Sequence, residues 1–174
     1  NLIYICAEAF SCYAIDETVT PTLYKMSQGG IVLNNFYNSF KNTTTNGEYA
    51  FMTGLWPDVS RVAHANSAAG SFVQSKNKLL PFTLGNMFEN LGVKTHAFHN
   101  FRGYYYQRNK THPNLGYTNL KFMGQGMNFT SSWPSSDLEM MEQSIDDYIN
   151  QEQFHAYYMT FSGHYQYNWD NAMS

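Results

Sequence analysis

Apolar residues along the chain gather in short runs that alternate with amphipathic stretches. The run at residues 2–6 is continuously apolar, which is typical of a strand covered on both faces in a parallel sheet. Further strands are predicted at residues 31–40, 93–98, 120–123 and 154–161. Since helices are expected between these strands, the pattern predicts an α/β fold.

Four helices are predicted from the periodic stretches and their end signals. A short helix begins at Pro21 after the N-cap Thr20, because proline is favoured at the first helical position, and two glycines end it. Thr45 and Glu48 fit a capping box, which predicts a helix over about 46–55. The other two helices are predicted at residues 83–91 and 136–150.

The composition is that of a folded domain. The length of 174 residues predicts one domain, residues 1–174, and 13% charged with 17% aromatic residues argues against intrinsic disorder. A formal charge of −3 argues against nucleic acid as a partner. No run of about 18 apolar residues is present, so no membrane span is expected within the chain. Because the chain opens directly in an apolar run, we interpret it as part of a longer protein.

The two cysteines, Cys6 and Cys12, are predicted to be free thiols. A zinc site usually needs four ligands with short paired spacing. A disulfide scaffold needs more cysteines than this chain has.

Glu8 directly follows the first predicted strand, where open α/β sheets place their binding sites. It is a lone carboxylate among apolar neighbours, and a buried carboxylate is costly unless it is paired or binds a metal. One interpretation is therefore a metal ligand. The other is an exposed or Arg-paired glutamate.

Thr43, Thr44 and Thr45 lie just before the predicted helix at 46–55. A helix N-terminus carries free N–H groups and a positive partial charge, which stabilise an alkoxide or a phosphate. A nearby divalent metal would further favour a threonine nucleophile. Plain capping is the alternative, in which Thr45 acts with Glu48 and the other two hydroxyls stay available.

His99 and His164 each lie at or just after the end of a predicted strand, and Arg108 follows the tyrosines 104–106. Arginine suits bidentate recognition of phosphate, and aromatic rings beside it can stack on a polyol or a lipid headgroup. The alternatives are a packed tyrosine loop and a structural histidine. Together these clusters predict one site on the side of the sheet where strands end.

Several segments resemble one known family. Residues 1–11, Thr20-Pro21, residues 35–37, residues 44–49 and residues 159–165 follow in the order found at the start of the extracellular catalytic domain of lipoteichoic acid synthases. These are phosphoglycerol transferases of the alkaline phosphatase and sulfatase superfamily, and the resemblance covers essentially the whole chain. It implies a three-layer α/β/α sandwich with a mostly parallel sheet, here C-terminally truncated.

The resemblance also implies a reaction. In such enzymes a threonine at this helix start attacks the phosphorus of phosphatidylglycerol, releases diacylglycerol and holds a glycerophosphate ester. Counting back from Glu48 places that nucleophile at Thr44. Glu8 matches the first metal ligand and Thr44 is a further ligand, with a divalent ion of the Mn²⁺ type as cofactor. The acceptor would be a glycerophosphate polymer or a surface glycan.

Four more residues match positions that bind substrate in this family: His99, Tyr106, Arg108 and His164. Tyr106 and Arg108 stand where the family has a Trp-x-Arg pair, so the tryptophan is replaced here by tyrosine. This replacement predicts a shifted acceptor or headgroup preference.

A second departure concerns the metal site, which the family completes with an Asp-His pair much further along. The chain has no Asp-His dipeptide up to Ser174, so weak or absent metal binding and no turnover are expected for it alone. A sulfatase proper is disfavoured, because neither cysteine lies in the Cys/Ser-x-Pro-x-Arg pattern that forms its nucleophile. The resemblance places the enzyme at the extracellular face of the bacterial cell membrane, with transmembrane helices upstream of Asn1.

Two other functions stay open from the sequence. One is a phosphoethanolamine transferase or a phosphodiesterase of the same superfamily, which a headgroup transfer assay would separate. The other is a non-catalytic module that binds wall polymer without turning it over.

Overall fold

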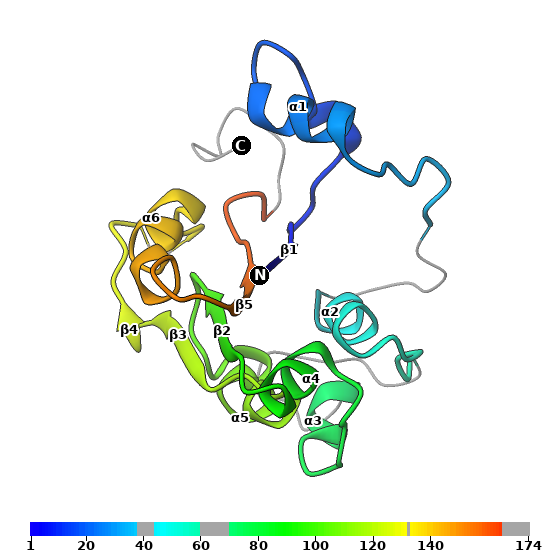
Figure 1. Cartoon of the computed structure of the whole chain (residues 1–174), viewed down its shortest axis with the longest axis vertical. Helices are drawn as coiled ribbons and strands as arrows, with labels where there is room; N and C mark the ends of the chain where they lie inside the picture. The colour runs from blue at the N-terminus through cyan, green and yellow to red at the C-terminus, as the bar shows by residue number, and fades with distance from the viewer. Residues whose placement is uncertain (38–43, 60–69, 132, 165–174) are drawn as a thin grey trace.

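A parallel sheet of five strands forms the centre of the computed structural model, which describes residues 1–37, 44–59, 70–131 and 133–164 (Figure 1). The order of the strands is β1-β5-β2-β3-β4, and each neighbouring pair is parallel. The strands are β1 Leu2–Cys6, β2 Lys94–His99, β3 Asn119–Met123, β4 Gly126–Met127 and β5 Phe154–Met159. The predicted α/β fold is confirmed.

Helices pack on both faces of this sheet, with α2 to α5 on one side and α6 on the other (Figure 1). The α-helices are α1 Pro21–Gly29, α2 Thr44–Thr53, α3 Ser71–Ser75, α4 Leu84–Asn90, α5 Arg108–Thr111 and α6 Asp137–Glu142. Short 3₁₀ helices are η1 Cys12–Ala14, η2 Tyr105–Gln107, η3 Pro113–Leu115 and η4 Ile145–Asp147. The result is the predicted three-layer arrangement.

The two core clusters meet at β5, whose six residues are all buried. Successive side chains of a strand point to opposite faces. Tyr157 and Met159 therefore pack with α2 and α3 on one face, while Phe154 and Tyr158 pack with Met140 of α6 on the other. Alternation along one central strand thus joins the two halves of the core.

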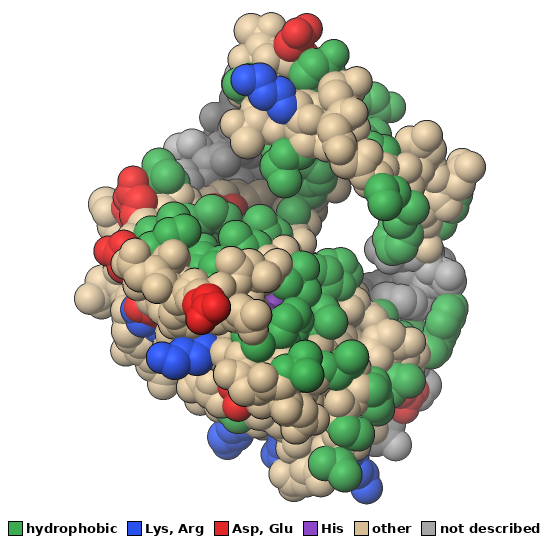
Figure 2. Space-filling model, viewed as in Figure 1, with side chains coloured by type: hydrophobic (Ala, Val, Ile, Leu, Met, Phe, Trp, Pro, Cys, Tyr) green, Lys and Arg blue, Asp and Glu red, His purple; other side chains and the backbone are tan. Residues whose placement is uncertain are grey.

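Strand β1 differs from the prediction that both of its faces are covered. Ile3 and Ile5 are 49% and 45% exposed, whereas Tyr4 packs inward and stacks on Phe51 at a centroid distance of 3.9 Å. Within the described ranges, β1 pairs only with β5, and none of residues 1–37 is buried. Hydrophobic side chains are prominent on the face of the molecule seen in Figure 2, among fewer charged ones.

The strand predicted at 31–40 is wrong for the residues that are described. Residues 31–37 form no strand, and residues 38–40 lie outside the described ranges. A turn falls at Asn34 and Asn35, and asparagine favours turns because its side chain bonds to nearby backbone. Local turn chemistry outweighs the apolar run that precedes it.

The helix predicted at 136–150 is divided into α6 and the 3₁₀ helix η4. Ser144 lies at the break and is fully buried. Its hydroxyl donates to the carbonyl of Met140 at 2.7 Å and also lies 2.8 Å from the Tyr158 hydroxyl. A serine that bonds back to the preceding turn competes with helical hydrogen bonds, which explains why α6 ends early.

Other elements agree with the sequence to within a few residues. The helices predicted at 46–55 and 83–91 are α2 and α4, and the strands at 93–98, 120–123 and 154–161 are β2, β3 and β5. Cys6 and Cys12 are free thiols, as predicted. None of the described helices has the length and apolar character needed to cross a membrane.

The register of the sheet brings three strand ends together. Cys6 at the end of β1 pairs with Met159 at the end of β5, and Met159 pairs in turn with His99 at the end of β2. Because parallel strands share one carboxyl edge, the segments that follow them start side by side. This edge holds the candidate site.

Candidate active site

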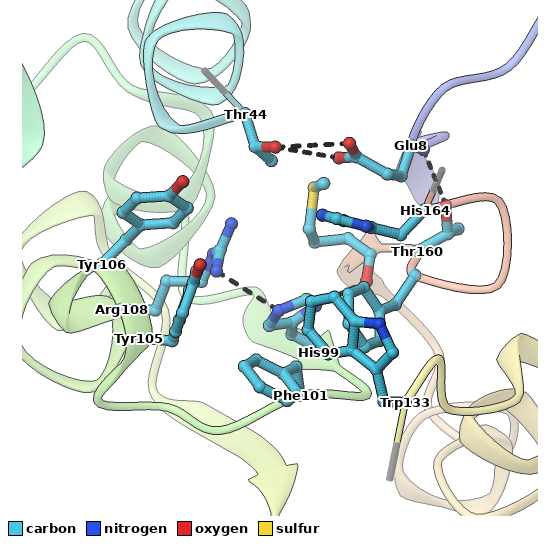
Figure 3. Close-up of a pocket in the computed structure, with 12 residues that line it drawn as sticks. Glu8, Thr44, His99, Phe101, Tyr105, Tyr106, Arg108, Trp133, Thr160 and His164 are labelled. Carbon is cyan, nitrogen blue, oxygen red and sulfur yellow. Dashed lines mark hydrogen bonds between the residues drawn. The ribbon is translucent and has the colours of Figure 1, made fainter. Parts of the chain in front are cut away.

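A pocket lies at the carboxyl edge of β1, β5 and β2 (Figure 3). It is lined by Glu8, Thr44, His99, Phe101, Tyr105, Tyr106, Arg108, Trp133, Met159, Thr160, Phe161 and His164. Every residue that the sequence singled out as catalytic, substrate-binding or metal-binding is in this set. The structure therefore brings these residues together, while their chemical roles remain predictions.

Thr44 and Glu8 face each other across the pocket (Figure 3). The Thr44 hydroxyl donates to the Glu8 carboxylate, with Oγ1 3.3 Å from Oε1 and 3.2 Å from Oε2. Thr44 is the first residue of α2, where backbone N–H groups favour negative charge. Its neighbour Thr45 is 3% exposed and does not line the pocket, and Thr43 lies outside the described residues.

The loop after β1 fixes Glu8 through its backbone. The Glu8 N–H donates to Oγ1 of Thr160 at 2.8 Å, and the Thr160 N–H donates to the Cys6 carbonyl at 3.1 Å. Ala9, the next residue, has a φ of 52°, which is uncommon for a residue with a side chain. Thr160 was missed as a site residue, although it lies within the segment 159–165 that carries the family resemblance.

The capping role predicted for Glu48 is wrong. Its side chain is 0% exposed and turns into the core, where Oε1 and Oε2 accept from Nε of Arg108 at 3.1 and 3.0 Å. Nη2 of Arg108 lies 2.9 Å from Oε2. The capping pattern is local, but a charge-assisted fork with a residue 60 positions away is the stronger interaction.

Burial and charge act in opposite directions on this pair. Burial by itself raises the pKa of Glu48, but the charge of Arg108, with a smaller contribution from the adjacent His112 ring, outweighs it and holds the pKa well below its ordinary value. For Arg108, burial lowers the pKa, and the neighbouring Glu48 carboxylate more than compensates. Both side chains are therefore charged.

His99 is a buried neutral imidazole. Its Nδ1 lies 3.0 Å from the Met159 carbonyl, which only accepts, and its Nε2 lies 3.2 Å from Nη1 of Arg108, which only donates. These partners assign the proton to Nδ1 and leave Nε2 as an acceptor. Burial, together with the charge of Arg108, lowers the pKa of His99 to about 3.

Tyr106 packs beside Arg108, with the guanidinium carbon 5.3 Å from its ring centroid. The chain enters α5 through Tyr106 and Gln107, which both have positive φ, of 54° and 55°. Adjacent residues in this sparsely populated conformation cost energy and tend to occur at functional sites. Burial raises the pKa of Tyr106 to about 12, so the phenol stays neutral.

His164 belongs to an aromatic wall opposite Thr44 (Figure 3). Its ring lies edge-on to Trp133 and Phe161 at centroid distances of 5.0 and 5.2 Å. Phe101 contacts the same two aromatic rings at 5.5 and 4.9 Å. Trp133 and Phe101 could not be predicted as site residues, because neither lies in a segment with recognisable chemistry.

Glu8 and Thr44 fit part of a divalent-metal site. Carboxylate and hydroxyl oxygens suit hard cations such as Mg²⁺ and Mn²⁺. In the part of the chain that the structure describes, no group of three or more His, Cys, Asp or Glu could hold a metal. Two oxygen donors are too few for the usual coordination number of about six, so the site needs further ligands.

The fold and the pocket define an α/β protein whose candidate site lies at the carboxyl edge of its strands, where open sheets bind ligands. A family model described as Sulfatase matches residues 1–172. The chain therefore belongs to the sulfatase family. The predicted resemblance to this superfamily is confirmed.

One solved structure has the same fold within a longer chain. It is described as the lipoteichoic acid synthase LtaP from Listeria monocytogenes and is 19% identical, with a TM-score of 0.71. The similarity covers 94% of this chain and 41% of that one, so the chain spans less than half of that protein's length. No match was found among curated proteins.

Proposed function

We propose that the chain is part of a metal-dependent enzyme that transfers glycerophosphate from phosphatidylglycerol to a cell-surface polymer or glycan through a covalent threonine intermediate. The observation that carries the proposal is the placement of Thr44. Its hydroxyl stands at the start of α2, 3.2 Å from a Glu8 oxygen, in a pocket that also contains the Arg108 cation. Hydroxyl, carboxylate and arginine together are a set suited to a phosphate ester.

In the first half-reaction, Oγ1 of Thr44 forms a bond to the phosphorus of phosphatidylglycerol. The bond from phosphorus to the diacylglycerol oxygen breaks, and diacylglycerol leaves with a proton. Glu8 accepts the hydrogen bond of the Thr44 hydroxyl and so turns its proton away from the reacting phosphorus. In the second half-reaction an acceptor hydroxyl attacks the threonine ester and restores Thr44.

The substrate-binding roles fall to His99, Tyr106, Arg108 and His164. Arg108 counters the negative charge of the phosphate, as arginine does in many phosphate-binding sites. His99 lines the pocket wall, and its Nε2 accepts from Nη1 of Arg108, which holds the guanidinium beside the phosphate. Tyr106 and His164 line the remaining walls and contact the glycerol.

A divalent metal, which we propose to be Mn²⁺, would be held by Glu8 and Thr44 together with ligands from an Asp-His pair further along the protein. When bound, it would lower the pKa of the Thr44 hydroxyl and polarise a phosphoryl oxygen. By itself the chain supplies two donors and is expected to be inactive. We place the enzyme at the extracellular face of a bacterial membrane, anchored by upstream transmembrane helices.

The test uses the complete reading frame that contains this chain, with MnCl₂ and fluorescent phosphatidylglycerol, and follows release of diacylglycerol. Thr44→Val should abolish release, because it removes the attacking oxygen and keeps the shape. Thr45→Val is the matched control, since it makes the same change at the next residue, which does not line the pocket. Equal activity of the two variants would contradict the proposed nucleophile.

The same assay separates the alternatives. Release from phosphatidylethanolamine alone would indicate a phosphoethanolamine transferase, and hydrolysis without an acceptor would indicate a phosphodiesterase. Binding of a glycerophosphate polymer without any release would indicate a non-catalytic module. Each of these outcomes would replace phosphatidylglycerol transfer as the function.

A further inference from the structure

Arg108 is restrained on two sides before any substrate binds. Its Nε and Nη2 lie against the Glu48 carboxylate, and its Nη1 donates to Nε2 of His99 at 3.2 Å. A guanidinium has five N–H donors in a fixed plane. Three of them are used by these partners, and the remaining two are available to the pocket that Arg108 lines.

The Glu48 carboxylate has two further close neighbours. The Tyr157 hydroxyl donates to Oε1 at 2.9 Å, and Nε2 of His112 lies 3.3 Å from the same oxygen. Tyr157 belongs to the central strand β5, and His112 follows α5. The carboxylate is thus fixed by the sheet on one side and by the α5 segment on the other.

The same carboxylate is linked to the candidate nucleophile through α2. Glu48 lies four residues after Thr44, and residues four apart share one face of a helix. The pairing of Glu48 with Arg108 therefore sets where α2 sits relative to the arginine. One buried ion pair thus fixes the distance between the Thr44 hydroxyl and the Arg108 guanidinium.

We infer that Glu48 is a positioning residue, which holds the Arg108 guanidinium and the Thr44 end of α2 in register across the pocket. This inference rests on the proposed function, because it assigns Glu48 a part in that reaction without contact with the substrate. A buried ion pair usually adds little stability over a well-packed apolar pair. Stability therefore does not explain why this ion pair is present. Its position between Thr44 and Arg108 does, because it connects two residues that line the pocket.

A double-mutant cycle on the complete protein tests this inference. The variants are Glu48→Gln, Arg108→Gln and the double variant, and kcat/KM is measured per folded molecule. Glu48→Gln should lower kcat/KM on the order of tenfold to a hundredfold, as expected for hydrogen bonds to a charged group. In the Arg108→Gln background the same change should cost less than about twofold, because the residue it positions is gone.

Asp147→Asn is the matched control, since it also neutralises a carboxylate that pairs with a basic residue, Lys121, but lies away from the pocket. It should leave kcat/KM unchanged. A purely structural role predicts that Glu48→Gln reduces the folded fraction and leaves kcat/KM of the folded molecules as in the wild type. That result, or additive losses in the cycle, would overturn the inference.

If Glu48→Gln does not fold, Tyr157→Phe takes its place. This variant removes one hydrogen bond to Glu48 and keeps the charge, so a loss in kcat/KM of about threefold is expected. An unchanged kcat/KM in this folded variant would count against the positioning role.

A binding measurement separates this inference from the proposed function. Inorganic phosphate is titrated with MnCl₂ present, and the ¹⁵Nε–H signal of Arg108 is followed by NMR in selectively labelled protein. The signal should be protected from exchange and respond to phosphate in the wild type, and lose both properties in the folded Glu48→Gln or Tyr157→Phe variant. If no headgroup is transferred, these changes would still support positioning of Arg108 while the proposed reaction fails. An unchanged signal would overturn the positioning role whether or not transfer occurs.

Discussion

Two ion pairs, Glu48 with Arg108 and Lys121 with Asp147, differ in burial far more than in distance. Their closest N–O separations are 2.9 and 2.7 Å. The side chains of the first pair are at most 2% exposed, whereas those of the second are 21–23% exposed. Arg108 of the buried pair lines the pocket, and the half-buried pair joins β3 to η4 away from it.

The difference shows that contact distance does not indicate what an ion pair contributes. Water screens the Lys121 and Asp147 charges, so such pairs typically stabilise a protein by less than about 1 kcal/mol. Glu48 and Arg108 are removed from water at a high desolvation cost, which only intact pairing offsets. A buried pair is therefore costly to break, although forming it brings little net stability.

The largest effect is expected from breaking the buried pair on one side. Arg108→Met leaves the buried Glu48 carboxylate without its guanidinium partner, so the free energy of unfolding should fall by about 3–5 kcal/mol. The double variant Glu48→Leu/Arg108→Met should recover part of this loss, because neither charge of the pair stays buried, whereas the Tyr157 hydroxyl loses its acceptor. Urea unfolding followed by circular dichroism measures both, and a single-variant loss below about 1 kcal/mol would contradict the comparison.

A smaller effect is expected from pH, through His99. Its folded-state pKa of about 3 lies below the ordinary 6.5, so between these values the unfolded chain binds a proton that the folded chain does not. Stability is therefore lost as the pH falls below about 6.5, and Glu48, whose pKa is also lowered, adds to the loss below its ordinary 4.5.

His99→Gln should flatten this profile by on the order of 1–3 kcal/mol between pH 6.5 and 4.5. His96 and His155 also have lowered pKa values, chiefly through burial, so part of the slope should remain in the variant. Urea midpoints across this range provide the measurement. A profile as steep as that of the wild type would show that His99 titrates normally.

The smallest effect is expected at the half-buried pair of Lys121 and Asp147. Asp147→Asn should lower the free energy of unfolding by less than about 1 kcal/mol, and the difference should shrink in high salt, which screens surface charges. Parallel unfolding curves at low and high salt measure this. A loss as large as that of Arg108→Met would remove the distinction between the two pairs.

The sequence predicted much of the site, because that site depends on strand ends. Glu8, His99 and His164 follow apolar runs, and parallel strands bring such positions to one edge. The threonine cluster marked the start of α2, and the resemblance selected Thr44 from it. Glu48 was misassigned, because a capping pattern is local whereas its partner Arg108 lies 60 residues away.

By itself the sequence determined the family and the alternation of strands and helices. Both depend on short-range patterns of residue type. Only the tertiary structure decided which polar groups share a partner. It joined Ser144, just after the end of α6, to the Tyr158 hydroxyl, and it joined the Glu8 backbone to Thr160. These contacts join residues that are distant in sequence or on different elements, and packing of the whole core places them within hydrogen-bonding distance.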